Sequence, residues 1–152
     1  MLFRTHLTFA LLIALFTFNK FNINKILFFI IILFSAAFPD IDQYKSKIGR
    51  KFGIISRLIN FIFGHRGIIH SLVFLIPLTI VIWIIFKNLY IPFLLGFLSH
   101  LILDGLTLQG INFLYPVSKL ETKGFIRTGG LLEQIFFILL VIIVVSRIIQ
   151  LI

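Results

Sequence analysis

Cysteine is absent from this 152-residue chain, so disulfide bonds and thiolate metal ligands are excluded. Acidic residues are scarce, with five Asp and Glu against 14 Lys and Arg. No internal repeat and no low-complexity linker divides the chain, and we therefore expect one domain over residues 1–152. A nucleic-acid partner is not expected, because no basic stretch is interleaved with exposed aromatic residues or placed on a soluble module.

Hydrophobic residues dominate what is present. They make up 60% of the sequence, Phe alone occurs 20 times, and the mean hydropathy is +1.15. Only 12% of the residues are charged, about half the share that is usual in soluble globular domains. The composition predicts an all-α integral membrane protein of the multi-pass type. In such a chain an excess of cations sets the topology and contacts anionic membrane lipids.

Five apolar segments are expected to cross the membrane. The first resembles a signal peptide, because Arg4 precedes an apolar core, but no small-residue cleavage site follows it. We therefore interpret it as a retained span. Pro39 ends the second span, since proline cannot continue a normally bonded helix. The predicted spans cover residues 2–18, about 21 or 26 to 38, 68–86, 89–108 and 131–152.

Two connecting segments differ from the spans. Residues 43–63 alternate basic and apolar side chains, a pattern typical of an amphipathic helix in the membrane interface. Residues 110–130 contain Pro116 and several glycines and are expected to form a loop.

The five-span topology divides the cations unequally between the two sides of the membrane. One side holds Lys20, Lys25, Lys87 and Arg147. The positive-inside rule places the amino terminus in the cytoplasm, because its side collects the other ten cations: Arg4, Lys45, Lys47, Arg50, Lys51, Arg57, Arg66, Lys119, Lys123 and Arg127.

Polar residues interrupt the fourth apolar segment at one place. His100 and Asp104 are four residues apart, so on a helix they share one face and can reach one metal ion or one proton path. A carboxylate buried in hydrocarbon costs several kcal/mol unless it is paired or metal-bound. We expect Asp104 to be neutralised by another part of the chain.

The other histidines and most acids fall at the same predicted membrane depth and side as His100. Each has an ordinary alternative: a histidine can bond a neighbouring helix, and an acid after Pro39 can cap a turn. Their agreement in side and depth nevertheless predicts one cluster. The candidate metal ligands are His6, Asp40, His65, His70, His100 and Asp104, and the candidate catalytic residues are Asp42, Arg66 and Glu133.

Imidazoles and carboxylates without thiolates suit transition metals better than calcium or magnesium. We expect one or two divalent ions, zinc first, with manganese or iron(II) as alternatives. Arg66 lies between two candidate ligands in the sequence, and its planar guanidinium suits a phosphate. Which carboxylate binds the ion and which acts as general base stays open at this point.

Four motifs in this order resemble the YdjM-like family of inner-membrane metal-dependent hydrolases. They are His6, Phe-Pro-Asp-Ile-Asp at 38–42, Gly-His-Arg-Gly-Ile-Ile-His-Ser at 64–71, and Ser-His-Leu-Ile-Leu-Asp-Gly-Leu-Thr-Leu-Gln-Gly at 99–110. The resemblance implies a site at Asp40, Asp42, His65, His70, His100 and Asp104. The family is distantly similar to zinc-dependent phospholipase C and P1-type nucleases, which points to a phosphoester.

The sequence thus predicts a hydrolase of the cytoplasmic membrane that activates water against an anionic phosphoester, with membrane lipids as partners. A proton- or ion-coupled transporter is one alternative, because intramembrane His and Asp can form a relay. A non-catalytic protein whose metal joins short helices is the other. An open coordination position would favour catalysis, and a closed shell would favour the structural role.

Overall fold

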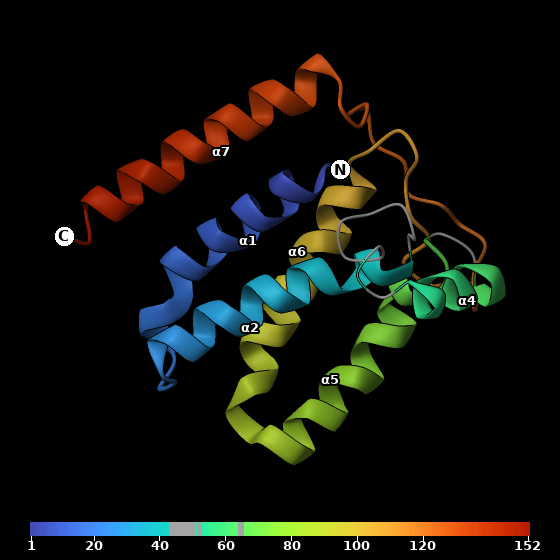
Figure 1. The fold of residues 1–152 in the computed structure, drawn as a ribbon, viewed down its shortest axis with the longest axis horizontal. Helices are drawn as coiled ribbons and strands as arrows, with labels where there is room; N and C mark the ends of the chain where they lie inside the picture. The colour runs from blue at the N-terminus through green and yellow to red at the C-terminus, as the bar shows by residue number, and fades with distance from the viewer. Residues whose placement is uncertain (43–50, 52, 64–65) are drawn as a thin grey trace.

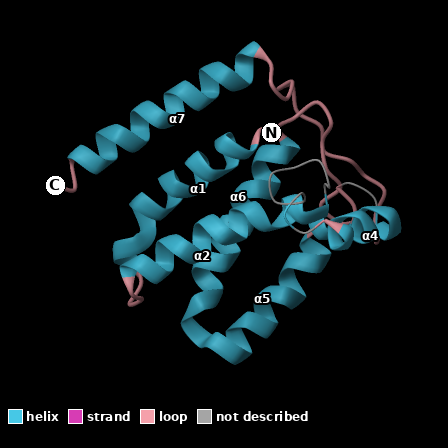
Figure 2. Ribbon diagram, in the orientation of Figure 1, coloured by secondary structure: helices cyan, strands magenta, loops and turns pink. Residues whose placement is uncertain are grey.

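The computed structural model describes residues 1–42, 51, 53–63 and 66–152. Every named element in this part of the chain is a helix, and pairing between extended residues is limited to isolated bridges (Figure 2). The α-helices are α1 (Phe3–Thr17), α2 (Lys25–Ala37), α4 (Ile54–Phe63), α5 (Leu72–Phe86), α6 (Tyr90–Gly105) and α7 (Leu131–Ile149). The predicted all-α class is confirmed.

Short 3₁₀ segments stand at the ends of these helices. They are η1 (Phe18–Lys20), η2 (Phe38–Asp42), η3 (Ile68–His70) and η4 (Lys87–Leu89). Helix α2 ends at Ala37, two residues before Pro39, as the sequence predicts. Helix α5 begins at a capped turn, in which Ser71 Oγ accepts a hydrogen bond from the Phe74 amide at 3.2 Å.

The number of membrane-crossing segments differs from the prediction. Among the residues that the structure describes, two segments, Leu72–Gly105 and Leu131–Ile149, are long and apolar enough to cross a membrane, whereas the sequence predicts five spans. The physical reason is helix length. Helices α1 and α2 have 15 and 13 residues, whereas Leu72–Gly105 is long because α5 and α6, of 15 and 16 residues, are joined through η4 without a break. At a rise of about 1.5 Å per residue α1 and α2 reach about 20–23 Å, less than the hydrocarbon core of about 30 Å.

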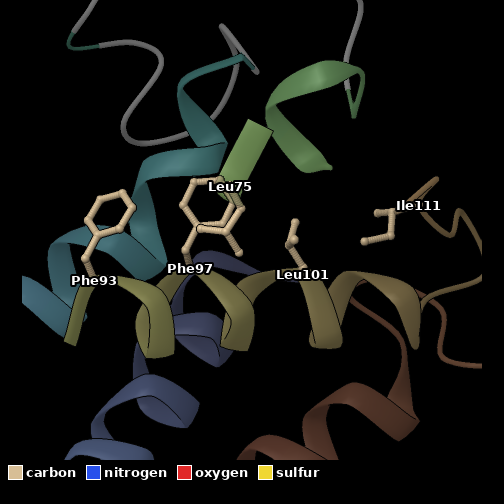
Figure 3. Close-up of a cluster of buried hydrophobic side chains, with 5 residues drawn as sticks. All are labelled: Leu75, Phe93, Phe97, Leu101 and Ile111. Carbon is tan, nitrogen blue, oxygen red and sulfur yellow. The ribbon is translucent and has the colours of Figure 1, made fainter. Parts of the chain in front are cut away.

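The segment Leu72–Gly105 is itself folded back (Figure 1). It reverses at η4, where Lys87 has a positive φ of 43°, so that α5 and α6 pack against each other. Leu75, Phe93, Phe97, Leu101 and Ile111 form the buried core that joins α5, α6 and the following loop (Figure 3). Helix α7 packs along α1 (Figure 1).

Helices α2 and α6 approach each other closely at Gly96. A Cβ atom at this position would lie 2.1 Å from Ser35 Oγ and 2.2 Å from the carbonyl oxygen of Ile32. Any larger residue would push the two helices apart. The absence of a side chain therefore brings the α2 backbone next to the polar residues of α6.

The connecting segments were predicted as an interfacial helix and a loop. Part of the first, α4, is helical and exposes Ile54, Leu58 and Phe61, whereas residues 43–50 lie outside the described residues. The 110–130 loop is held by backbone bonds, among them the reciprocal pair between Ile111 and Thr122 at 2.8 and 3.0 Å. It folds back over the end of α6 (Figure 1).

Candidate metal centre

His100 projects from the third turn of α6 toward the end of α2. Its Nδ1 atom lies 2.7 Å from the carbonyl oxygen of Ala36, at hydrogen-bonding distance. A carbonyl oxygen only accepts hydrogen bonds, so Nδ1 carries the proton and Nε2 presents its lone pair. The close α2–α6 contact at Gly96 makes this possible, because it brings the Ala36 carbonyl within reach.

His70 is oriented by Asp42 in the same way. Its Nδ1 atom lies 2.9 Å from Asp42 Oδ2. The same oxygen accepts a hydrogen bond from the backbone amide of Arg66 at 3.0 Å. Arg66 has a positive φ of 62°, which is uncommon for a residue with a side chain. This backbone conformation accompanies the amide contact to Asp42, which in turn fixes the imidazole of His70.

The two Nε2 atoms face each other. His70 Nε2 lies 3.2 Å from His100 Nε2, and both residues are fully buried. Two nitrogen ligands of one tetrahedral zinc ion, each about 2.0–2.1 Å from the metal, would lie about 3.3 Å apart. When both imidazoles are neutral with the proton on Nδ1, their two Nε2 lone pairs face each other at this distance, an arrangement that a shared cation stabilises.

Asp104 lies between this pair of imidazoles and a second group of nitrogen atoms. Its Oδ2 atom is 3.6 Å from Nε2 of both His70 and His100. Its Oδ1 atom lies 3.2 Å from His6 Nε2 and 3.0 Å from Arg66 Nη2, and it also contacts the amino group of Met1. The buried carboxylate is thus neutralised from several chain segments, as the sequence led us to expect.

Asp40 completes the cluster from η2. Its Oδ1 atom lies 4.0 Å from His100 Nε2. Two sets of three residues bring ligand atoms within 4.8 Å of one another: His6, His100 and Asp104 in one set, and Asp40, His70 and His100 in the other. The rings of His6 and His100 stack with centroids 3.8 Å apart. Both sets are buried and consist of nitrogen and oxygen donors, which suit a divalent transition metal.

The remaining predicted site residues have other partners. Glu133 accepts hydrogen bonds from the Leu2 amide at 2.6 Å, from Thr5 Oγ1 at 2.9 Å and from the Gly129 amide at 2.6 Å. These contacts tie the start of α1 to the start of α7, and Glu133 belongs to neither ligand set. His65 lies outside the described residues.

Arg66 lies beside the cluster, and two nitrogen atoms of its guanidinium already have partners. Nη1 donates to Thr107 Oγ1 at 2.9 Å and to the Gly110 carbonyl at 2.8 Å, while Nη2 faces Asp104. The orienting carbonyl of Ala36 had no sequence signal, because every residue carries such a group. Thr107 lies inside the motif at 99–110, but nothing in the sequence indicated that its hydroxyl would contact Arg66.

The fold and the site together define a helical protein with membrane-spanning hydropathy and a buried His/Asp cluster able to hold a divalent metal. The sequence model of the YdjM inner membrane protein family matches residues 1–151, and the chain belongs to this family. No solved structure matches the chain.

Two similar proteins cover part of the chain. The uncharacterized protein YvsG of Bacillus subtilis is 39% identical over 103 residues, which are 66% of this chain and 64% of that protein. The inner membrane protein YdjM of Escherichia coli is 38% identical over 85 residues, 51% of this chain and 43% of that protein. Each match thus spans less than two thirds of the relative's own length.

Proposed function

We propose that this protein is a metal-dependent hydrolase of the inner membrane that acts on a phosphoester. One observation carries the proposal. Two buried imidazoles have their Nδ1 atoms against the acceptors Ala36 O and Asp42 Oδ2, and their Nε2 atoms lie 3.2 Å apart. Oriented imidazoles with an acceptor behind each ring are the usual outer shell of a metal site.

The donor set suits zinc, with manganese or iron(II) as alternatives. His70, His100, Asp104 and Asp40 would hold one ion. Asp104 also turns its other oxygen toward His6, so a second ion would share this carboxylate. A bound ion of this kind would acidify a water molecule so that hydroxide forms at neutral pH.

The proposed reaction is the addition of water to the phosphorus of the ester. The P–O bond to the alcohol breaks, and the alcohol leaves with a proton from the water. Asp42 holds His70, so its role is positioning. Asp40 is the most exposed of the three cluster carboxylates, at 12% of its side chain, and is therefore best placed to meet an entering water molecule.

We further propose that the cluster opens toward the cytoplasm, with the amino terminus on the same side and several helices crossing the membrane. Arg4, Lys119, Lys123 and Arg127 belong to the segments around the cluster. Lys20 and Lys87 lie at the turns η1 and η4, away from it (Figure 1). The bias of cations toward one end supports this orientation.

Metal analysis of the purified protein tests the proposal. The wild-type chain should retain about one or two equivalents of a divalent transition metal and should hydrolyse a phosphoester. The double variant His70→Ala, His100→Ala should lose both. Lys20→Ala, which removes an exposed cation at η1, should change neither. Metal content equal in wild type and double variant would refute these ligands, provided that circular dichroism shows both to be folded.

A structural metal is the second candidate, and the burial of the cluster favours it. All three described histidines are at most 1% exposed. An ion enclosed in this way would hold η2, η3, α1 and α6 together. X-ray absorption of the metal-loaded protein separates the two functions. An exchangeable oxygen ligand supports catalysis, whereas a shell completed by protein ligands supports the structural role.

A further inference from the structure

A cavity of about 590 Å³ lies beside the His/Asp cluster. It is formed where the segment before η3 meets the loop that follows α6, and its walls include Arg66, Gln109, Tyr115, Lys119 and Glu121. Its size lies in the range of small-molecule binding sites. It adjoins the cluster, because Arg66 lines the cavity and also contacts Asp104.

Arg66 connects the cavity to the candidate metal centre. Its side chain is 11% exposed and lines the cavity, while its Nη2 atom lies 3.0 Å from Asp104 Oδ1. The other guanidinium nitrogen, Nη1, is held by Thr107 and Gly110. A group bound in the cavity would thus lie one side chain away from Asp104.

Lys119 carries the uncompensated charge of the cavity, because Arg66 is paired with Asp104. Arg66 and Lys119 are its cations, and Glu121 is its acid. The carboxylate of Glu121 pairs with Lys123, with Nζ and Oε2 2.7 Å apart, so its charge is already compensated from outside the cavity. Lys119 is exposed and has no described ion pair, so its ammonium group is available to an anion.

The loop that forms one wall of the cavity exposes apolar side chains, here called the apolar rim. Leu114, Val117, Leu120 and Phe125 on the same loop are exposed by 50, 79, 82 and 71% of their surface. Large apolar side chains interleaved with lysines are typical of a surface that lies in the interface of a membrane. Such a rim favours a ligand that brings its own acyl chains over a free phosphate.

We propose that this cavity binds the phosphate group of a membrane phospholipid, with Lys119 as the anion-binding residue and the apolar rim against the acyl chains. The inference rests on the proposed function, because it names the substrate class of the same site. It assigns phosphate recognition to Lys119, while Arg66 links the bound group to Asp104.

Native mass spectrometry of the full-length protein in non-ionic detergent tests this proposal with three probes. The first is a dioctanoyl phosphonate analogue of phosphatidic acid, whose P–C bond resists hydrolysis. Glycerol 3-phosphate carries the phosphate without acyl chains, and dioctanoylglycerol carries the acyl chains without phosphate. The phosphonate lipid should bind most tightly of the three.

Two lysine variants form the matched pair. Lys119→Ala should weaken binding of the phosphonate lipid about fivefold, the contribution of one basic residue near an anionic membrane surface. Lys20→Ala removes the same charge from η1, outside the cavity, and should leave binding unchanged. Equal weakening by both variants would overturn the proposal. So would glycerol 3-phosphate or dioctanoylglycerol binding as tightly as the phosphonate lipid.

Metal analysis of the same preparations keeps this proposal separate from the proposed function. Lys119→Ala should retain the wild-type metal content, because Lys119 belongs to neither ligand set. A wild-type protein without metal that still prefers the phosphonate lipid through Lys119 would refute the hydrolase and support the lipid site. A wild-type protein that contains metal, but whose lipid binding is unchanged by Lys119→Ala, would support the metal site and refute the lipid site.

Discussion

His70 Nε2 and His100 Nε2 lie 3.2 Å apart, although η3 and α6 are separated by the whole of α5. Neither nitrogen reaches this position by chance orientation of a ring. Asp42 stands behind one imidazole and the Ala36 carbonyl behind the other. The pair is the geometric centre of the site, and the predictions below follow from how it is held.

Removing a bound metal should destabilise the protein, because the facing nitrogens would lose the cation between them. We expect a chelator to lower the thermal midpoint of the wild-type protein in detergent, measured by circular dichroism. In His100→Ala the same chelator should have no effect. An equal shift in both proteins would show that the chelator acts elsewhere.

Asp42→Asn should weaken metal binding without displacing a ligand. The amide can no longer act as a charged acceptor for His70 Nδ1, and loss of such an outer-shell partner typically lowers metal affinity about 10–100-fold. Competition with a chromogenic chelator measures the change. Glu121→Gln, the same chemical change at an exposed carboxylate, is the control and should keep wild-type affinity. Unchanged affinity in Asp42→Asn would remove Asp42 from the site.

Gly96→Ala should destabilise the fold and loosen His100. The added Cβ would meet Ser35 Oγ at 2.1 Å and the Ile32 carbonyl at 2.2 Å. Overpacking of this kind typically costs about 1–3 kcal/mol. Gly105→Ala is the matched control, because its Cβ would meet only the ring of Phe113, at 3.2 Å. We expect the thermal midpoint to fall clearly more in Gly96→Ala, and equal midpoints would contradict the close α2–α6 contact.

Glu133→Gln should affect stability and leave the metal in place. The carboxylate accepts from Leu2, Thr5 and Gly129 and is completely buried. An amide can satisfy only part of these donors, and an unsatisfied buried donor costs about 1–3 kcal/mol. The thermal midpoint should therefore fall while metal content stays at the wild-type level. Loss of hydrolysis at an unchanged midpoint would instead support the catalytic role that the sequence predicted.

Accessibility of single cysteines tests the membrane topology, and the chain is suited to it because it contains no native cysteine. Leu120→Cys in the loop after α6 should react with a membrane-impermeant thiol reagent from the cytoplasmic side. Asn88→Cys in η4 should react from the opposite side, because α5 and α6 reverse there. Labelling of both positions from one side would show that this helical hairpin does not cross the membrane.

The sequence predicted more of the site than of the membrane spans. His100 and Asp104 were expected to cooperate from their spacing on one helix, and the structure brings their Nε2 and Oδ2 atoms within 3.6 Å. The number of spans was overestimated, because apolar composition does not reveal where a helix ends. Short 3₁₀ segments stand at the ends of the apolar runs. Segment η2 follows the second run and carries Asp40 and Asp42, and η3 opens the third and carries His70.

By itself, the amino-acid sequence determined the helical class, the family and the residue types of the site, because hydropathy and local spacing are encoded along the chain. Only the tertiary structure decided which acid serves which purpose. Asp42 orients His70, whereas Glu133 joins α1 to α7. The reason is that a carboxylate's role depends on the donors that distant segments bring to it. Contacts between distant segments leave no repeating pattern in the sequence from which they could be predicted.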